Sequence, residues 1–167
     1  PGFSISIYEN NKESYYFNSK YLDKEQSKPF SKNSIFRIFS MTKPIVSTAA
    51  MQLFEKGKFN LDDPVKKFIP EWNNLEVYES GSKGDFKTKE ANRDMIMLDL
   101  FTHTSGLTYG LQKQTPVDEE YGRSGIENVV DSRGINGTLS SDEIINLLSG
   151  IPLEFSPGSH YNYSLSI

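Results

Sequence analysis

The chain contains no cysteine, two histidines and one tryptophan in 167 residues. The absence of cysteine excludes a disulfide scaffold, a thiolate zinc site and a cysteine nucleophile, and two histidines are too few for a histidine-based metal cluster. No run approaches the roughly 20 apolar residues of a membrane span, and the N-terminus lacks the basic-then-apolar layout of a signal peptide. We therefore expect no metal, no cofactor and no membrane span.

Basic residues are also fewer than acidic residues. The sequence has 18 Lys and Arg against 22 Asp and Glu, which gives a net charge of −4. Nucleic-acid binding needs a basic footprint, so the charge argues against it. There is no Gly-rich phosphate loop and no G-x-S-x-G elbow, and the acidic residues are scattered, so we expect them to be surface groups without a carboxylate cluster.

The hydrophobic fraction, 36%, is low for a self-contained globular chain, although 13% aromatic residues exclude disorder. The length fits one ordinary domain or two small lobes. A fragment of a larger fold and a loop-rich domain would both have this composition. Without cysteine the chain suits either side of a membrane, so its localisation stays open, as does its oligomeric state.

Residue patterns predict a hairpin and four helices, one of them a short helix that Asp62-Asp63-Pro64 opens and Pro70 closes. Phe3, Ile5 and Ile7 alternate with polar residues, Asn10-Asn11 suits a turn, and residues 14–17 form the returning strand. Helices are predicted over 40–56, over 96–102 and after Ser140, which forms a capping box with Glu143. We expect 73–94 to be a loop or exposed hairpin, 108–139 to be irregular, and Trp72 to be a packing residue.

The predicted helix 40–56 opens with Ser40-Met41-Thr42-Lys43. Positions i and i+3 lie on one helix face, so the lysine amine can reach the serine hydroxyl, and the helix N-terminus favours negative charge there. Serine is a weak nucleophile until a neighbouring base takes its proton. An ordinary helix cap with a surface lysine would give the same four residues.

One further interpretation concerns this helix, and another concerns a second copy of its S-x-x-K pattern. Its apolar positions, which we expect to belong to the core, are Val46, Ala49, Ala50, Leu53 and Phe54. The S-x-x-K pattern recurs at residues 80–83, in a polar segment that contains Gly81, and we interpret that copy as a solvated linker.

Several segments together resemble the serine β-lactamase and penicillin-recognising family, in the branch of class C β-lactamases, D-alanyl carboxypeptidases and family VIII carboxylesterases. The segments are residues 36–44, 61–65, 100–107 (Leu-Phe-Thr-His-Thr-Ser-Gly-Leu), 152–158 and 163–164. They follow one another in the family's order over nearly the whole chain.

The resemblance implies roles for four residues. Ser40 would be the acylated nucleophile, and its backbone N–H half of the oxyanion hole. Lys43 and Tyr163, the latter five residues after Gly158 as in the family, would act as bases. His103 would be a structural residue of a tight turn. Tyr161 has the wrong spacing to replace Tyr163.

Two other residues are candidates for substrate binding. Leu165 stands where the β-lactamases and carboxypeptidases of this branch have the Asn of a Y-x-N motif, so the sequence resembles the esterases there, as it does at 106–110 and 116–118. His160 could border the pocket, although its position favours an ordinary histidine of a surface loop.

The resemblance also implies a fold: an α/β sheet lobe with an all-α lobe, the β-lactamase/transpeptidase-like fold. The third motif and late strands of that fold, which supply the second oxyanion N–H, have no counterpart within these residues, so we expect an incomplete fold and weak or no activity from this chain alone. Residues 1–39 would contribute the hairpin of the sheet lobe, and 40–167 the nucleophile helix and a mostly helical lobe with long loops.

Three functions remain open. The first is a serine hydrolase, most simply a carboxylesterase, that forms an acyl-enzyme with a small ester. The second is a β-lactamase or D-alanyl-D-alanine carboxypeptidase. The third is a non-catalytic member that keeps the fold and binds a ligand such as peptidoglycan. In the first two, the partner is a small-molecule ester or β-lactam-like substrate.

Overall fold

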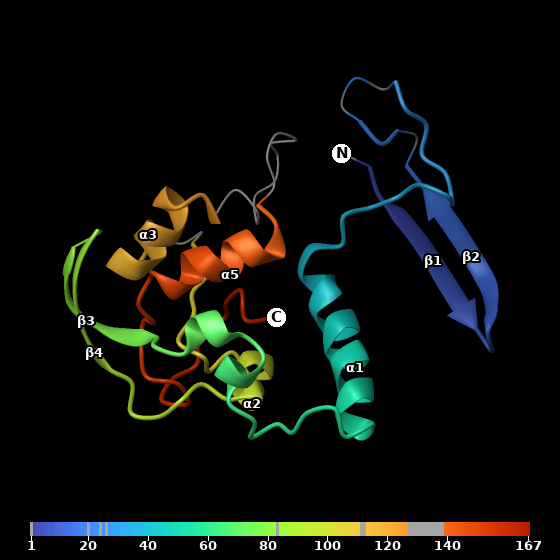
Figure 1. The fold of residues 1–167 in the computed structure, drawn as a ribbon. Helices are drawn as coiled ribbons and strands as arrows, with labels where there is room; N and C mark the ends of the chain where they lie inside the picture. The colour runs from blue at the N-terminus through green and yellow to red at the C-terminus, as the bar shows by residue number, and fades with distance from the viewer. Residues whose placement is uncertain are drawn as a thin grey trace. The chain divides into compact units, whose positions relative to one another are not determined.

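The computed structural model describes residues 2–19, 21–23, 25, 27–82, 84–110, 113–126 and 139–167. By their internal contacts the residues form two compact units, Pro1–Ser40 and Met41–Ile167 (Figure 1).

The first unit is built on an antiparallel hairpin of β1 (Ser4–Glu9) and β2 (Lys12–Asn18), with a bulge between Ile7 and Tyr8. Asn10 and Asn11 form the turn with φ of 50° and 62°. Both turn positions require the left-handed region, which asparagine tolerates better than most residues. The predicted hairpin and its turn are confirmed.

One face of this hairpin carries its apolar side chains. Ile5 pairs with Phe17 and Ile7 with Tyr15, and all four are exposed within the described residues. The alternation of apolar and polar residues thus produced a strand with one apolar face, as the period of a strand requires.

The second unit begins with α1 (Thr42–Glu55), which follows the 3₁₀ turn η1 (Phe39–Met41). The predicted helix is confirmed, but the expectation that its apolar stripe is core is wrong. The helix has no buried residue, and Val46 and Leu53 are each 48% exposed. An apolar stripe is buried only where another element packs on it, and the described residues of this unit build their core elsewhere.

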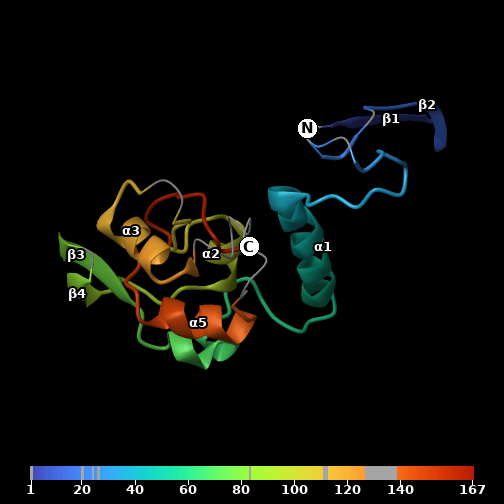
Figure 2. The same ribbon diagram turned by 90° about the horizontal axis from the view of Figure 1, so that it is seen from above.

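That core lies among the later elements. They are η2 (Val65–Lys67), η3 (Pro70–Trp72), β3 (Glu76–Ser82), β4 (Asp85–Glu90), α2 (Met97–Phe101), α3 (Pro116–Arg123) and α5 (Ser141–Ser149). In both views, α3 and α5 lie beside the β3–β4 hairpin (Figure 2). The buried cluster comprises Val65, Trp72, Val77, Met95, Leu107, Val117, Tyr121, Ile126, Leu148, Ile151 and Leu153.

Local signals explain several of these elements. Trp72 packs in the core as predicted and donates its indole N–H to the Ile145 carbonyl at 3.1 Å. The capping box is confirmed: the Ser140 hydroxyl accepts from the Glu143 N–H at 3.2 Å, and the Glu143 carboxylate accepts from the Ser140 N–H at 2.7 Å. The predicted short helix near residue 100 is α2.

Two expectations need correction. The stretch 108–139 is not wholly irregular, because α3 begins there: Pro116 occupies its first turn, and the Thr115 hydroxyl caps it by accepting from the Asp118 N–H at 3.1 Å. The first three residues of the second S-x-x-K pattern belong to strand β3 rather than a linker, and its Lys83 lies outside the described residues, as do 127–138. Among the described helices, none is long and apolar enough to cross a membrane.

A pair of glycines provides a test of the second unit's packing. Gly106 has φ +89°, and a Cβ there would lie 2.3 Å from the Phe155 carbonyl oxygen. Gly57 has φ +66°, but a Cβ on Gly57 would have no other heavy atom within 4 Å. We expect Gly106→Ala to lower the free energy of unfolding by about 3 kcal/mol or more, because strain and collision add, and Gly57→Ala by only about 1 kcal/mol. Urea unfolding measures both; equal losses would contradict the packing at Gly106.

Candidate active site

The S-x-x-K residues occupy the junction of η1 and α1. Ser40 is an exposed residue of η1 and the last residue of the first unit. Lys43 is the second residue of α1 and belongs to the second unit, with His160, Tyr163 and Leu165. The serine therefore lies three positions before the lysine, where a 3₁₀ turn runs into the helix.

The structure brings Lys43 and Tyr163 together, although 120 positions separate them in the sequence (163 − 43). The Lys43 ammonium lies 5.3 Å from the centroid of the Tyr163 ring and 5.6 Å from that of Tyr109, and it donates to the carbonyl oxygen of Ile167. The two tyrosine rings stack at 5.6 Å with an interplanar angle of 26°. A cation over ring faces is attracted by their negative potential, so this trio is a favourable arrangement.

Tyr163 is held on both sides by His103. The His103 Nδ1 accepts from the Ser164 N–H at 3.2 Å, and the His103 carbonyl accepts from the Asn162 N–H at 2.9 Å. The imidazole centroid lies 4.7 Å from that of the Tyr163 ring. His103 itself has φ +57°, which shows the tight turn expected there. The histidine therefore positions the backbone that carries the tyrosine.

The charge state of His103 suits this role. Burial lowers the pKa of the imidazole, and the positive charge of Lys43 lowers it further. A neutral ring leaves Nδ1 free to accept, whereas an imidazolium could only donate. The hydrogen bond from Ser164 thus assigns the remaining ring proton to Nε2.

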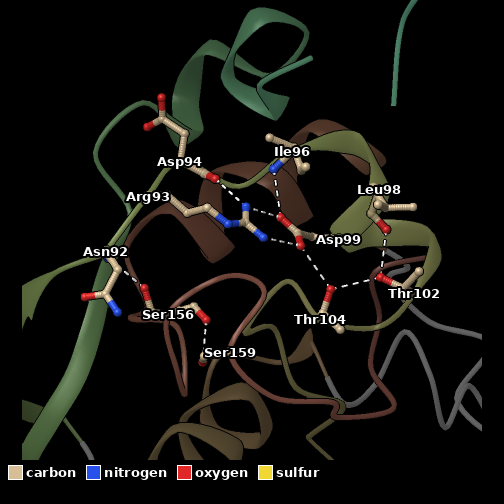
Figure 3. A network of polar contacts seen from close by, with 10 residues as sticks. All are labelled: Asn92, Arg93, Asp94, Ile96, Leu98, Asp99, Thr102, Thr104, Ser156 and Ser159. Atoms are coloured by element: carbon tan, nitrogen blue, oxygen red, sulfur yellow. Dashed lines mark hydrogen bonds and ion pairs between the residues drawn. The ribbon is translucent and has the colours of Figure 1, made fainter. Parts of the chain in front are cut away.

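The turn around His103 is anchored by Asp99 (Figure 3). The Asp99 side chain is 3% exposed, and its carboxylate accepts a hydrogen bond from each terminal nitrogen of Arg93 at 2.7 Å. It also accepts from the Ile96 N–H at 2.9 Å and the Thr104 hydroxyl at 3.0 Å. One buried carboxylate thus provides a hydrogen-bond acceptor for the backbone N–H at the start of α2 and fixes Thr104, the residue that follows His103.

The network continues to the segment before Tyr163. The Thr104 carbonyl accepts from the Gly158 N–H at 2.8 Å, and the Arg93 guanidinium lies where a Cβ on Gly158 would be. The Ser156 hydroxyl accepts from the Asn92 N–H at 2.6 Å (Figure 3). The Asp99 network therefore holds both the His103 turn and the irregular segment that leads to Tyr163.

The two candidate substrate-binding residues lie in different surroundings. Leu165 is partly buried, packs against the hydrophobic core, and donates its N–H to the Thr108 carbonyl at 3.2 Å. His160 is exposed, contacts the Ser159 hydroxyl at 2.9 Å, and has its ring 5.3 Å from that of Phe155. Tyr161 is 69% exposed.

Beside Tyr163 lies a small hollow of about 50 Å³. Its lining includes the carboxyl residues Asp118 and Glu154, the amide residue Asn162, and Tyr109. The expectation that acidic residues are merely scattered over the surface is therefore wrong, because Asp118 is 2% exposed and lines the same hollow as Glu154. They are 36 positions apart (154 − 118), so no local pattern in the sequence could have joined them.

Comparison with known proteins decides the family. The protein-family model described as Beta-lactamase matches residues 1–166 of the chain. The chain belongs to this family. The esterase EstB of Burkholderia gladioli is 32% identical over 146 residues, covering 87% of this chain and 33% of that protein. Protein Rv1367c of Mycobacterium tuberculosis is 33% identical, with 88% and 34% covered.

Solved structures agree with this assignment. EstCE1, a hydrolase with promiscuous acyltransferase activity, matches 99% of this chain and 39% of its own with a TM-score of 0.70 and 29% identity. The expected β-lactamase/transpeptidase-like fold is therefore confirmed, and the chain spans about a third of the length of the curated relatives it matches.

Removal of the Asp99 charge tests the network. We expect Asp99→Asn to lower the free energy of unfolding by about 2–3 kcal/mol at neutral pH, because it leaves Arg93 without its bidentate partner. Asp94→Asn, a control in an exposed ion pair with Lys66, should cost less than about 1 kcal/mol. Urea unfolding measures both, and equal small losses would contradict the anchoring role.

The same carboxylate predicts the pH dependence of this difference. Burial favours its neutral form, but Arg93, the Ile96 N–H and Thr104 outweigh burial and lower the pKa of Asp99. Its contribution is then fully present above the pKa of an unfolded Asp, about 4, and is lost as the pH falls through the lower folded pKa. The gap between wild type and Asp99→Asn should close only at acidic pH.

The proximity of Lys43 and His103 can be measured without an activity assay. We expect the His103 imidazole to titrate below the usual value of about 6.5 in an NMR pH series. Lys43→Met should raise that pKa by removing a positive charge, without restoring the ordinary value because burial remains. Lys56→Met, at the opposite end of α1, serves as the control. An unchanged His103 pKa in Lys43→Met would contradict the arrangement.

Proposed function

We propose that the protein is a serine hydrolase that acts through an acyl-enzyme, and more narrowly a carboxylesterase. The observation that carries the proposal is the Lys43 ammonium against the Tyr163 ring, with Ser40 three positions before Lys43 at the start of α1. Membership of the Beta-lactamase family supports it.

The proposed reaction divides into two halves. The Ser40 hydroxyl attacks the ester carbonyl carbon while its proton passes to the Tyr163 oxygen, which enters the step as a phenolate beside the Lys43 ammonium. The backbone N–H of Ser40 stabilises the oxyanion. The departing alkoxide then takes a proton from Tyr163. In the second half, water attacks the acyl carbon and gives its proton to Tyr163. Tyr163 then returns that proton to the Ser40 oxygen as the bond to the acyl carbon breaks and the acid leaves.

An ester is favoured over a β-lactam by the residue that follows Tyr163-Ser164. Leu165 offers no side-chain amide to a β-lactam or peptide, and its partly buried side chain packs against apolar residues. The esterase EstB is among the relatives at above 30% identity. The other functions, a β-lactamase or D-alanyl carboxypeptidase and a non-catalytic member, are outcomes that the following experiment separates.

The experiment is labelling of the protein with a fluorophosphonate, followed by intact-mass analysis and peptide mapping. We expect one adduct, on Ser40, that is absent in Ser40→Ala. With 4-nitrophenyl butanoate, Tyr163→Phe should lower kcat/KM by about 10²–10⁴-fold through loss of the proton acceptor. Tyr161→Phe, which removes an exposed hydroxyl two positions away, should leave it nearly unchanged.

Other outcomes would contradict the proposal in distinct ways. A faster reaction with a cephalosporin than with the ester would favour the β-lactamase alternative. A folded protein that gives no adduct, both as this chain and in a longer version that supplies the third motif, would favour the non-catalytic one. Equal effects of Tyr163→Phe and Tyr161→Phe would remove Tyr163 from the mechanism.

A further inference from the structure

We propose that the hollow beside Tyr163 is a subsite for a primary ammonium group, so that the enzyme favours substrates with a positively charged arm. The claim that the ammonium group belongs to a substrate rests on the proposed function. The cation site itself is argued from the structure alone. Its basis is the juxtaposition of the Asp118 and Glu154 carboxylates with two tyrosine rings around one hollow.

Asp118 supplies a buried negative charge that its surroundings do not fully satisfy. One oxygen, Oδ1, accepts from the Thr108 hydroxyl at 2.8 Å and from the Gly110 N–H at 2.6 Å. The other, Oδ2, is buried and has no hydrogen-bond partner among the described residues. A buried carboxylate oxygen without a partner is costly, and a nearby cation would offset that cost.

Glu154 adds a second carboxylate to the same lining. It accepts from the Asn162 amide at 2.7 Å and from the Thr115 hydroxyl, both of which are neutral donors. Burial raises the pKa of Glu154, and the negative charge of Asp118 raises it further. The two acids therefore repel each other across a shared hollow.

The other described residues that line the hollow carry no positive charge to balance the two carboxylates. Among the described residues that line the hollow, there is no Lys, Arg or His. Lys43 contacts the Tyr109 and Tyr163 rings, but its ammonium is hydrogen-bonded to Ile167 and it is not part of this lining.

A primary ammonium fits this chemistry better than a divalent metal does. In the described part of the chain, no group of three or more His, Cys, Asp or Glu could hold a metal ion, whereas Ca²⁺ takes about six to eight oxygens. An ammonium carries three donors, which match carboxylate and hydroxyl oxygens such as those of Glu154 and Thr115. Since the hollow adjoins Tyr163, an ammonium bound there would belong to the arm of a substrate held at the reacting centre.

Binding is tested first, with n-propylammonium chloride as the probe and NMR chemical shifts of the Gly110 N–H and the Asn162 side-chain amide as the readout. We expect saturable shifts with the ammonium, and none with 1-propanol or with KCl at equal ionic strength. Glu154→Gln and Asp118→Asn should each weaken binding about tenfold, which equals about 1.4 kcal/mol. Glu119→Gln, an equal charge change at an exposed position of the same helix, should leave binding unchanged.

Because Asp118→Asn removes a buried group and could fail to fold, Glu154→Gln carries the decision. Equal shifts with KCl would show a site for inorganic cations and overturn the ammonium assignment. Undiminished ammonium binding in Glu154→Gln, or no binding at all in the wild type, would overturn the site.

The link to the reaction is tested second. We expect n-propylammonium to inhibit hydrolysis of 4-nitrophenyl butanoate competitively, and 1-propanol at the same concentration not to. Ammonium binding without competitive inhibition would overturn the substrate subsite. Ammonium binding in a protein that hydrolyses no ester would leave the cation site standing and reject the proposed function, so the two failures are distinguishable.

Discussion

The Asp99 carboxylate organises the part of the molecule that carries the candidate site. It is almost fully buried, holds Arg93 in a bidentate pair, and accepts from the Ile96 N–H and the Thr104 hydroxyl. A buried charge is tolerable only when its partners compensate its desolvation, so each of these groups has little freedom to move. The start of α2 and the turn after it are therefore fixed by one side chain.

Hydrogen bonds to backbone groups connect the Asp99 network to Tyr163 and fix the position of this tyrosine. The Thr104 carbonyl holds Gly158, and His103 holds the residues on either side of Tyr163. Burial and Lys43 keep the pKa of His103 low, so its Nδ1 remains an acceptor. The chemistry proposed for Lys43 and Tyr163 thus uses groups whose geometry is set by residues that need not touch a substrate.

Apolar surface is distributed unevenly between the elements. The core of the second unit packs around β3, α3 and α5, whereas α1 and one face of the β1–β2 hairpin keep large apolar side chains exposed within the described residues. Local propensity was sufficient to form α1, but burial of its stripe requires a partner element.

The sequence by itself determined the elements whose signals are local: the Asn10-Asn11 hairpin turn, the capped helix after Ser140, and the helix that begins beyond Ser40. Ordered motifs also identified the family and fold. Only the tertiary structure placed Lys43 against Tyr163 and joined Asp118 to Glu154 around one hollow. Neighbours along a chain impose their geometry through backbone periodicity, whereas residues far apart meet only where packing and buried hydrogen bonds bring their elements together.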